Sequence, residues 1–98
     1  MRKAYLVGHL TITNPQAYAV YSAQVPSTIA AFGGKYLVRG GATTILENSQ
    51  LGDRSVVIEF PSREAAESWY NSEAYQAIIQ HRLDNATGTL MLIDGYEL

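Results

Sequence analysis

Three side chains capable of acid–base or anion chemistry occur in segments with the composition of β-strands: His9, Arg39 and Glu59. Histidine titrates near neutral pH and can act as a general acid or base. Arginine keeps a fixed charge and binds carboxylate or carbonyl oxygens through several donors. If Tyr36 and Val38 face the helices, strand alternation places all three side chains on one face of a sheet. We therefore take them as the candidate catalytic residues.

Arg39 and Glu59 fall on neighbouring strands of an expected hairpin, where a cross-strand ion pair has two interpretations. The pair either fixes strand register or dimer contacts, or Arg39 anchors an anionic or carbonyl ligand. His9 is likewise either a site residue or a histidine with satisfied hydrogen bonds in the interior or at an interface. The sequence leaves both questions open.

Tyrosine is unusually frequent, with seven in 98 residues, and there is a single tryptophan. Tyr18 and Tyr21 recur with helical spacing among apolar residues, and Trp69 lies on the apolar side of a second expected helix. We predict that Tyr18, Tyr21, Tyr36 and Trp69 line a ligand-binding cleft between helices and sheet. In the alternative interpretation these rings belong to the core and their polar atoms reach protein partners.

Several kinds of site are missing from the sequence. There is no cysteine, which excludes thiol catalysis and thiolate metal sites. The two histidines are far apart in the chain, and no paired carboxylates supply metal-ligand spacing. The two Gly-Gly pairs do not match nucleotide-binding loops. We therefore expect neither a metal ion nor a bound cofactor.

The charge and hydropathy of the sequence limit the kinds of binding partner that we expect. The net charge is -2, and no run of basic residues exceeds the pair Arg2-Lys3, so nucleic acid is not an expected partner. No apolar run approaches the ~18 residues of a membrane span. The absence of cysteine is compatible with a reducing compartment, and we expect a cytoplasmic protein.

The chain reads as one domain, residues 1–98, with the element order β-α-β-β-α-β. Strands are expected at 3–12, from 35 onward, at 54–60 and at 89–95. Asn14-Pro15 and Ser62 are expected to begin the two helices, with a kink or restart at Pro26 and a break at Asn71-Ser72. This order is typical of the α+β ferredoxin-like fold, with an antiparallel sheet and both helices on one face.

The other face of this sheet is expected to be uncovered and half apolar. It would carry Val7 and Val57 beside His9 and Glu59. A domain this small has a limited core, and an exposed apolar face favours association. We therefore predict a homodimer in which two sheets pack face to face as a dimeric α+β barrel.

The stretch from Arg39 to Glu47 raises a separate question, because Gly40-Gly41 interrupts a strand-like pattern. Glycine accepts backbone angles that other residues resist, so the pair predicts a bulge or kink just after Arg39. The residues beyond it, 42–47, are then expected to bend towards a partner subunit.

Four segments resemble a bacterial family of small proteins known as domain of unknown function 1330. They are NPQAY (14–18), FGGKYLVRGG (32–41), VVIEFPS (56–62) and WYNSEAYQ (69–76), and they occur in the family's order. The resemblance implies the dimeric α+β-barrel superfamily, which also contains cofactor-free monooxygenases, lactone isomerases, haem-degrading enzymes and stress-related binding proteins. It implies a fold and no particular reaction.

Two functions are compatible with these features. The first is a cofactor-free oxygenase or isomerase that acts on a small organic molecule in an apolar pocket. The alternative is a non-catalytic dimer that binds a metabolite or has a structural or regulatory role. The absence of a recognisable nucleophile–base pair favours the second.

Overall fold

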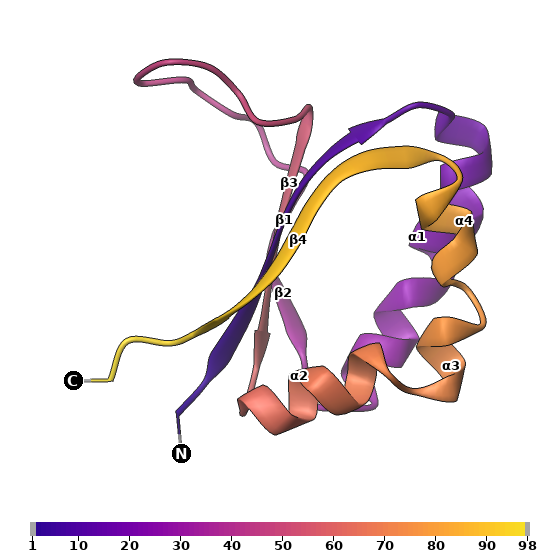
Figure 1. The fold of residues 1–98 in the computed structure, drawn as a ribbon, viewed down its shortest axis with the longest axis vertical. Helices are drawn as coiled ribbons and strands as arrows, with labels where there is room; N and C mark the ends of the chain where they lie inside the picture. The colour runs from indigo at the N-terminus through magenta and orange to yellow at the C-terminus, as the bar shows by residue number, and fades with distance from the viewer. Residues whose placement is uncertain (1, 98) are drawn as a thin grey trace.

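A four-stranded antiparallel sheet carries all the helices on one side (Figure 1), in a computed structural model that describes residues 2–97. The sheet order is β2-β3-β1-β4. The elements are β1 (Ala4–Ile12), α1 (Pro15–Ala30), β2 (Lys35–Arg39), β3 (Arg54–Phe60), α2 (Arg63–Tyr70), α3 (Glu73–Gln76), α4 (Ile79–Leu83) and β4 (Ala86–Asp94). The architecture is therefore the α+β ferredoxin-like fold that the sequence predicts.

Helices α1, α2 and α3 begin where polar capping residues precede them, whereas α4 follows Ile78 without a side-chain cap. Asn14 Oδ1 accepts the backbone N–H of Ala17, and Pro15 occupies the first position of α1. Ser62 caps α2 in the same way, and Ser72 caps α3 after the break at Asn71. These caps satisfy backbone donors that have no partner inside the helix.

Helix α1 runs through Pro26 without ending there. The expected restart is therefore wrong, although the physical consequence of the proline remains. Proline has no N–H, so the carbonyl oxygen of Ser22, four residues earlier, loses its usual helical donor. That oxygen is free to accept a hydrogen bond from outside the helix.

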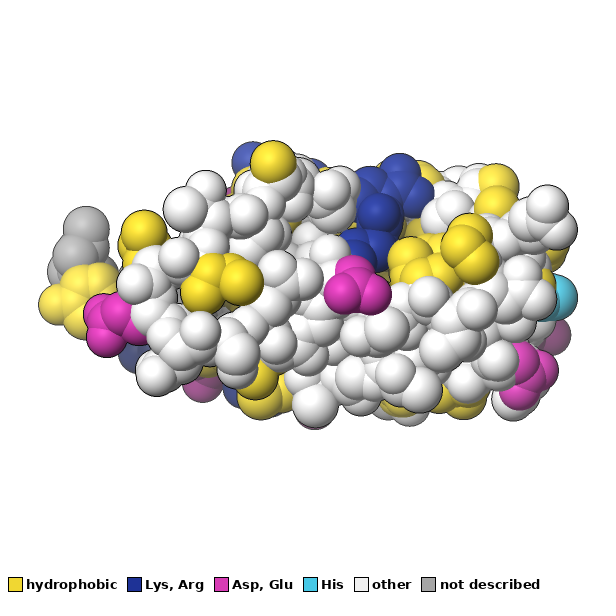
Figure 2. All heavy atoms as spheres, turned by 90° about the horizontal axis from the view of Figure 1, so that it is seen from above, with side chains coloured by type: hydrophobic (Ala, Val, Ile, Leu, Met, Phe, Trp, Pro, Cys, Tyr) yellow, Lys and Arg dark blue, Asp and Glu magenta, His cyan; other side chains and the backbone are white. Residues whose placement is uncertain are grey.

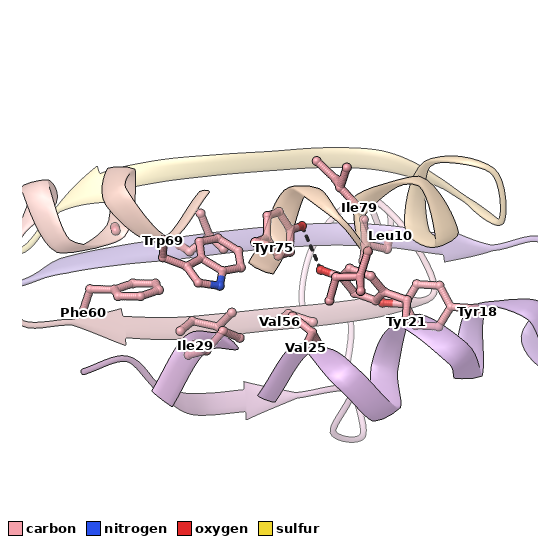
Figure 3. Packing of buried hydrophobic residues seen from close by; sticks show 14 residues of the cluster. Leu10, Tyr18, Tyr21, Val25, Ile29, Val56, Phe60, Trp69, Tyr75 and Ile79 are labelled. Carbon is pink, nitrogen blue, oxygen red and sulfur yellow. Dashed lines mark hydrogen bonds between the residues drawn. The ribbon is translucent and has the colours of Figure 1, made fainter. Parts of the chain in front are cut away.

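The core lies between the helices and one face of the sheet (Figure 3). Leu6, Leu10, Val56, Ile58 and Phe60 come from β1 and β3 and are buried. The helices cover them with apolar and aromatic side chains, among them Tyr21, Ile29, Trp69 and Tyr75.

The opposite face of the sheet has no helix over it (Figure 1). Val7 pairs with Val57 on one side and Met91 on the other, and Tyr5 pairs with Glu59 and Ile93. Met91 and Ile93 remain nearly half exposed. The half-apolar, uncovered face predicted from the sequence is thus present in the single chain.

A bulge in β2 corrects the predicted orientation of Arg39. Tyr36 pairs with Ile58, whereas Val38 pairs with Val57, so Leu37 is an extra residue in the strand. The alternation shifts by one position after it. Tyr36 and Arg39 both face the helices, and Val38 faces the open side of the sheet.

The bulge therefore precedes Arg39, and Gly40-Gly41 is not its position. Gly40 has a φ of 66° and forms the predicted bend, and strand β2 ends one residue before it. Residues 40–53 form a long loop that extends away from the helices (Figure 1). Within residues 2–97, no helix has the length and apolar character needed to cross a membrane.

Candidate functional site

A small cavity of about 30 Å³ lies between α1, the sheet, Trp69 of α2 and Arg82 of α4. Its apolar wall comes from β1, β3 and β4, with Leu6, Val56 and Leu90 among the lining residues. Phenol and guanidinium groups complete it: Tyr18, Tyr21, Tyr36, Arg39, Arg54 and Arg82. A mostly apolar hollow with a few convergent polar groups is the usual form of a small-molecule site.

Two tyrosines and one arginine form a buried hydrogen-bonded chain at this cavity. Arg82 Nε donates to the hydroxyl oxygen of Tyr75 at 3.3 Å, and the Tyr75 and Tyr21 hydroxyls share a hydrogen bond of 2.9 Å. Figure 3 shows the two phenol groups meeting between α1 and α3. Because Tyr75 accepts from Arg82, its own proton can point to Tyr21.

Burial decides the protonation of the phenols. It raises the pKa of Tyr21, and the adjacent Tyr75 raises it further. Burial also raises the pKa values of Tyr18 and Tyr36, although nearby arginines partly oppose this. These tyrosines are therefore neutral hydrogen-bonding groups at ordinary pH.

Arg82 keeps its charge although it is buried. Burial is the largest single influence and lowers the pKa of Arg82, but the neighbouring tyrosines, Tyr75 first among them, together raise it by more. The net shift is upward. A permanent cation thus lies at the cavity with a phenol as its hydrogen-bond partner.

Arg39 closes the cavity on the side of β2. Its Nη2 donates to the carbonyl oxygen of Ser22 at 2.6 Å, and its guanidinium lies 4.7 Å from the centre of the Tyr36 ring. The Arg39 side chain therefore connects the edge strand to helix α1. It does so through the carbonyl oxygen that Pro26 leaves free.

Arg54 enters the same cavity from the first position of β3. Its Nε is buried and has no hydrogen-bond partner within residues 2–97. A Cβ atom at Gly40 would collide with this guanidinium and displace it, and the φ of 66° at Gly40 also favours glycine. Figure 2 shows Lys or Arg side chains beside hydrophobic side chains near the middle of this face of the molecule.

The structure brings five of the seven predicted site residues together. Arg39, Tyr18, Tyr21, Tyr36 and Trp69 all line the cavity. Their roles in binding or catalysis stay predictions. The indole N–H of Trp69 already donates to Thr28 Oγ1 at 3.0 Å, so Trp69 supplies a wall and no free donor.

His9 and Glu59 lie elsewhere, on the open face of the sheet. The expected pair of Arg39 and Glu59 is absent, because Lys35 and not Arg39 lies opposite Glu59 and the bulge also turns Arg39 to the other face. Glu59 instead binds Lys3 at 2.7 Å. His9 Nδ1 is 3.3 Å from Ser55 Oγ. His9 and Glu59 are four positions apart in register, about 13 Å along the strands. Any catalytic role for them belongs to that open face.

Arg54 and Arg82 are the cavity residues that sequence reasoning missed. The signal was present in the periodicity. Arg54 alternates with Val56 and Ile58 in the strand, and Arg82 follows Tyr75 by seven positions along the apolar side of the last helical segment. Leu83, predicted for that apolar side, is instead 52% exposed.

Metal chemistry has no visible support in the described chain. Among residues 2–97, no three His, Cys, Asp or Glu side chains come together as a group that could hold a metal ion.

The sequence matches the family model described as Domain of unknown function (DUF1330) over residues 3–96. The protein belongs to this family. The match confirms the resemblance seen in the four sequence segments and brings no established activity. No functionally curated protein matches the sequence.

Solved structures show the same fold at low sequence identity. A protein of unknown function from Rhodopseudomonas palustris superposes with a TM-score of 0.77 at 20% identity, covering 99% of this chain and 83% of that one. SnoaB, a cofactor-independent oxygenase from Streptomyces nogalater, gives 0.65 at 13% identity, covering 100% and 97%. A structure described as an antibiotic biosynthesis monooxygenase gives 0.51 at 15%, covering 99% and 100%. These similarities establish the fold.

Proposed function

We propose that the protein binds a small organic molecule in the cavity between helices and sheet and converts it without a bound cofactor, as an oxygenase or isomerase. One observation carries the proposal: phenol and guanidinium groups converge on an apolar hollow, and one of the guanidiniums is buried. The shared fold with a cofactor-independent oxygenase supports the choice of reaction class.

Both reactions can pass through the conjugate base of the substrate. Three guanidiniums beside an apolar wall favour an enolate or phenolate over its neutral acid, since charge interactions are strong where water is excluded. In isomerisation the enolate takes up its proton at another carbon. In oxygenation the carbanion transfers its electrons to dioxygen, a C–O bond forms, and the resulting peroxide anion takes up a proton.

The lining residues set a condition on the substrate. None of those around the inner cavity is His, Asp or Glu, and burial makes the tyrosines poor bases. The substrate must therefore be acidic enough to lose its proton to solvent while the arginines stabilise the anion. Quinols and ketones or lactones activated by a second carbonyl group meet this condition.

The same lack of a base favours the second candidate, a non-catalytic protein that binds a metabolite or has a regulatory role. Here the arginines and tyrosines only recognise the ligand. In both cases the proposed functional form is a homodimer joined through the open sheet face, with Val7, Val57 and Met91 at its centre.

The single tryptophan makes the proposal testable, because Trp69 lines the cavity and ligand binding will alter its fluorescence. A panel of enolisable ketones, quinols and lactones is screened by this signal. Compounds that bind are then tested for oxygen uptake and for deuterium exchange at the acidic carbon. Arg82→Met is compared with Arg63→Met, an arginine outside the cavity.

Turnover or exchange that is lost in Arg82→Met and kept in Arg63→Met supports the enzyme. Binding with neither turnover nor exchange selects the non-catalytic candidate. A panel in which no compound changes the Trp69 signal contradicts both.

A further inference from the structure

We propose that the ligand of this cavity is a small organic carboxylate, with its charged group held between Arg54 and Arg82 and a compact apolar body beside it. The inference rests on the proposed binding function and adds the chemical class of the ligand. It follows from charge, burial and the shape of the hollow.

The cavity holds positive charge without a protein counterion. Arg39, Arg54 and Arg82 line it, and no lining residue of the inner cavity is acidic. The ion pairs among residues 2–97 involve Arg2, Lys3 and Arg63 instead. The phenols do not supply negative charge, because burial raises the pKa values of Tyr18, Tyr21 and Tyr36.

The burial of Arg82 makes the uncompensated positive charge of the cavity unfavourable for stability. It is 9% exposed, and Nε donates to the neutral Tyr75 hydroxyl. An arginine this buried normally has a carboxylate partner, because a charge removed from water must be compensated. A bound anion would provide the compensation that the protein itself does not.

Arg54 points to the same conclusion independently. Its Nε is buried with no partner within residues 2–97, which is rare for a buried donor. The glycine at position 40 keeps space for this guanidinium. Arg54 and Arg82 both act on Tyr18, since each lowers its pKa against the larger effect of burial. The two cations thus bracket one phenol that can donate to the same anion.

The shape separates a charged group from an apolar body. The inner cavity, at about 30 Å³, has room for a group such as a carboxylate. A wider groove of about 290 Å³ shares Leu6, Arg82 and Leu90 with it. The groove adds Ala66, Tyr70 and Leu92, a surface suited to a single ring or a branched alkyl group. Its polar members are Glu67 and Asn71, and within residues 2–97 Glu67 forms no ion pair with Arg82. Arg82 lies at the junction of the two spaces.

Benzoate is a direct probe, and benzamide is its neutral counterpart of nearly equal shape. Binding to the 98-residue protein is followed by Trp69 fluorescence and by calorimetry, with inorganic phosphate as a third compound. We expect benzoate to bind at least about tenfold more tightly than benzamide or phosphate, because charge-assisted hydrogen bonds are worth more than neutral ones. Benzoate should also raise Tm.

Arg82→Met is expected to weaken benzoate binding by about tenfold or more while Tm without ligand stays equal or rises, since an unpaired buried cation is replaced by an apolar chain. Arg63→Met is expected to bind as the wild type does. If Arg82→Met does not fold, Arg54→Met is measured instead, and it is expected to weaken benzoate binding in the same way.

Equal affinity for benzoate and benzamide, or full affinity in both cavity variants, overturns the inference and leaves the proposed function standing. Phosphate binding as tight as benzoate overturns the requirement for an organic body. If no aromatic compound of any charge changes the Trp69 signal, the proposed function fails as well.

Discussion

Arg39 donates a hydrogen bond of 2.6 Å to the carbonyl oxygen of Ser22, across the gap between strand β2 and helix α1. The acceptor is available because Pro26 lies four residues further along the helix and has no N–H. A proline that weakens the helix thereby creates an attachment point for the edge strand. The bulge at Leu37 is the second requirement, since it turns Arg39 towards the helices.

A double-mutant cycle tests this dependence. Arg39→Met is expected to lower the free energy of unfolding by about 0.5–1 kcal/mol, a modest value because Arg39 is exposed. Pro26→Ala restores the helical donor to Ser22, so Arg39→Met in that background should cost close to nothing. Urea unfolding of the four proteins gives the coupling. Equal costs in both backgrounds would show that the two residues act independently.

Much of the fold could be predicted from the sequence because its signals are local. Asn14-Pro15, Ser62 and Ser72 act through adjacent backbone groups, and the structure has each helix starting where they predict. Given the order of the helices and strands, the usual rules for connections between them allow only a few sheet topologies. The restart expected at Pro26 was wrong, since α1 continues through the proline.

The candidate site could be predicted only in part. The cavity tyrosines follow helical periodicity, but the position of Arg39 depends on one extra residue in β2, and nothing in the letters KYLVR identifies Leu37 as that residue. A shift of one position exchanges the faces, so Arg39 faces the helices while Tyr36 kept its orientation. The predicted pairing with Glu59 failed because the register sets Lys35, and not Arg39, opposite Glu59. The spacing of Arg54 and Arg82 places both on the apolar side of their elements. They were not predicted as cavity residues because arginine is usually exposed.

The buried chain from Arg82 through Tyr75 to Tyr21 predicts unequal effects of two similar substitutions. Tyr75→Phe removes the acceptor of Arg82 and the partner of Tyr21 together, and we expect a loss of about 1–3 kcal/mol. Tyr21→Phe leaves the bond between Tyr75 and Arg82 in place and should cost about 1 kcal/mol. Thermal and urea unfolding measure both. A larger loss of stability in Tyr21→Phe than in Tyr75→Phe would show that the hydrogen bond from Arg82 to Tyr75 is not the main contribution of these three residues.

Gly40 and Gly41 provide a matched pair of substitutions. Gly40→Ala places a Cβ against the Arg54 guanidinium at a φ of 66°, and we expect a loss of at least about 1–2 kcal/mol together with weaker ligand binding. A Cβ at Gly41 meets nothing within 4 Å, so Gly41→Ala should change stability by less than about 0.5 kcal/mol. Similar losses in the two variants would mean that loop flexibility, and not space for Arg54, requires the glycines.

The ion pair of Lys3 and Glu59 predicts a pH dependence of stability. The hydrogen bond from Lys3 lowers the pKa of Glu59 below its ordinary value. The folded state therefore binds this proton less readily than the unfolded state, and the resulting stabilisation is present above about pH 4.3 and lost as the pH falls through the folded pKa. The Tm difference between wild type and Glu59→Gln should shrink on acidification. A constant difference from pH 7 to pH 3 would exclude this linkage.

If the proposed dimer forms through the open sheet face, a charged substitution on that face should convert it to monomers. Val57 lies between Val7 and Val38 on that face, so Val57→Lys puts a charge in the middle of the apolar surface. We expect the wild type to be a dimer at micromolar concentration and Val57→Lys to be a monomer, because an unpaired charge cannot be buried without a large cost. Light scattering coupled to size exclusion gives the mass, and circular dichroism checks the fold. Gln16→Lys, an equal charge change on the exposed surface of α1, should remain a dimer. A monomeric wild type, or a Val57→Lys variant that stays dimeric, would show that this face is not the interface.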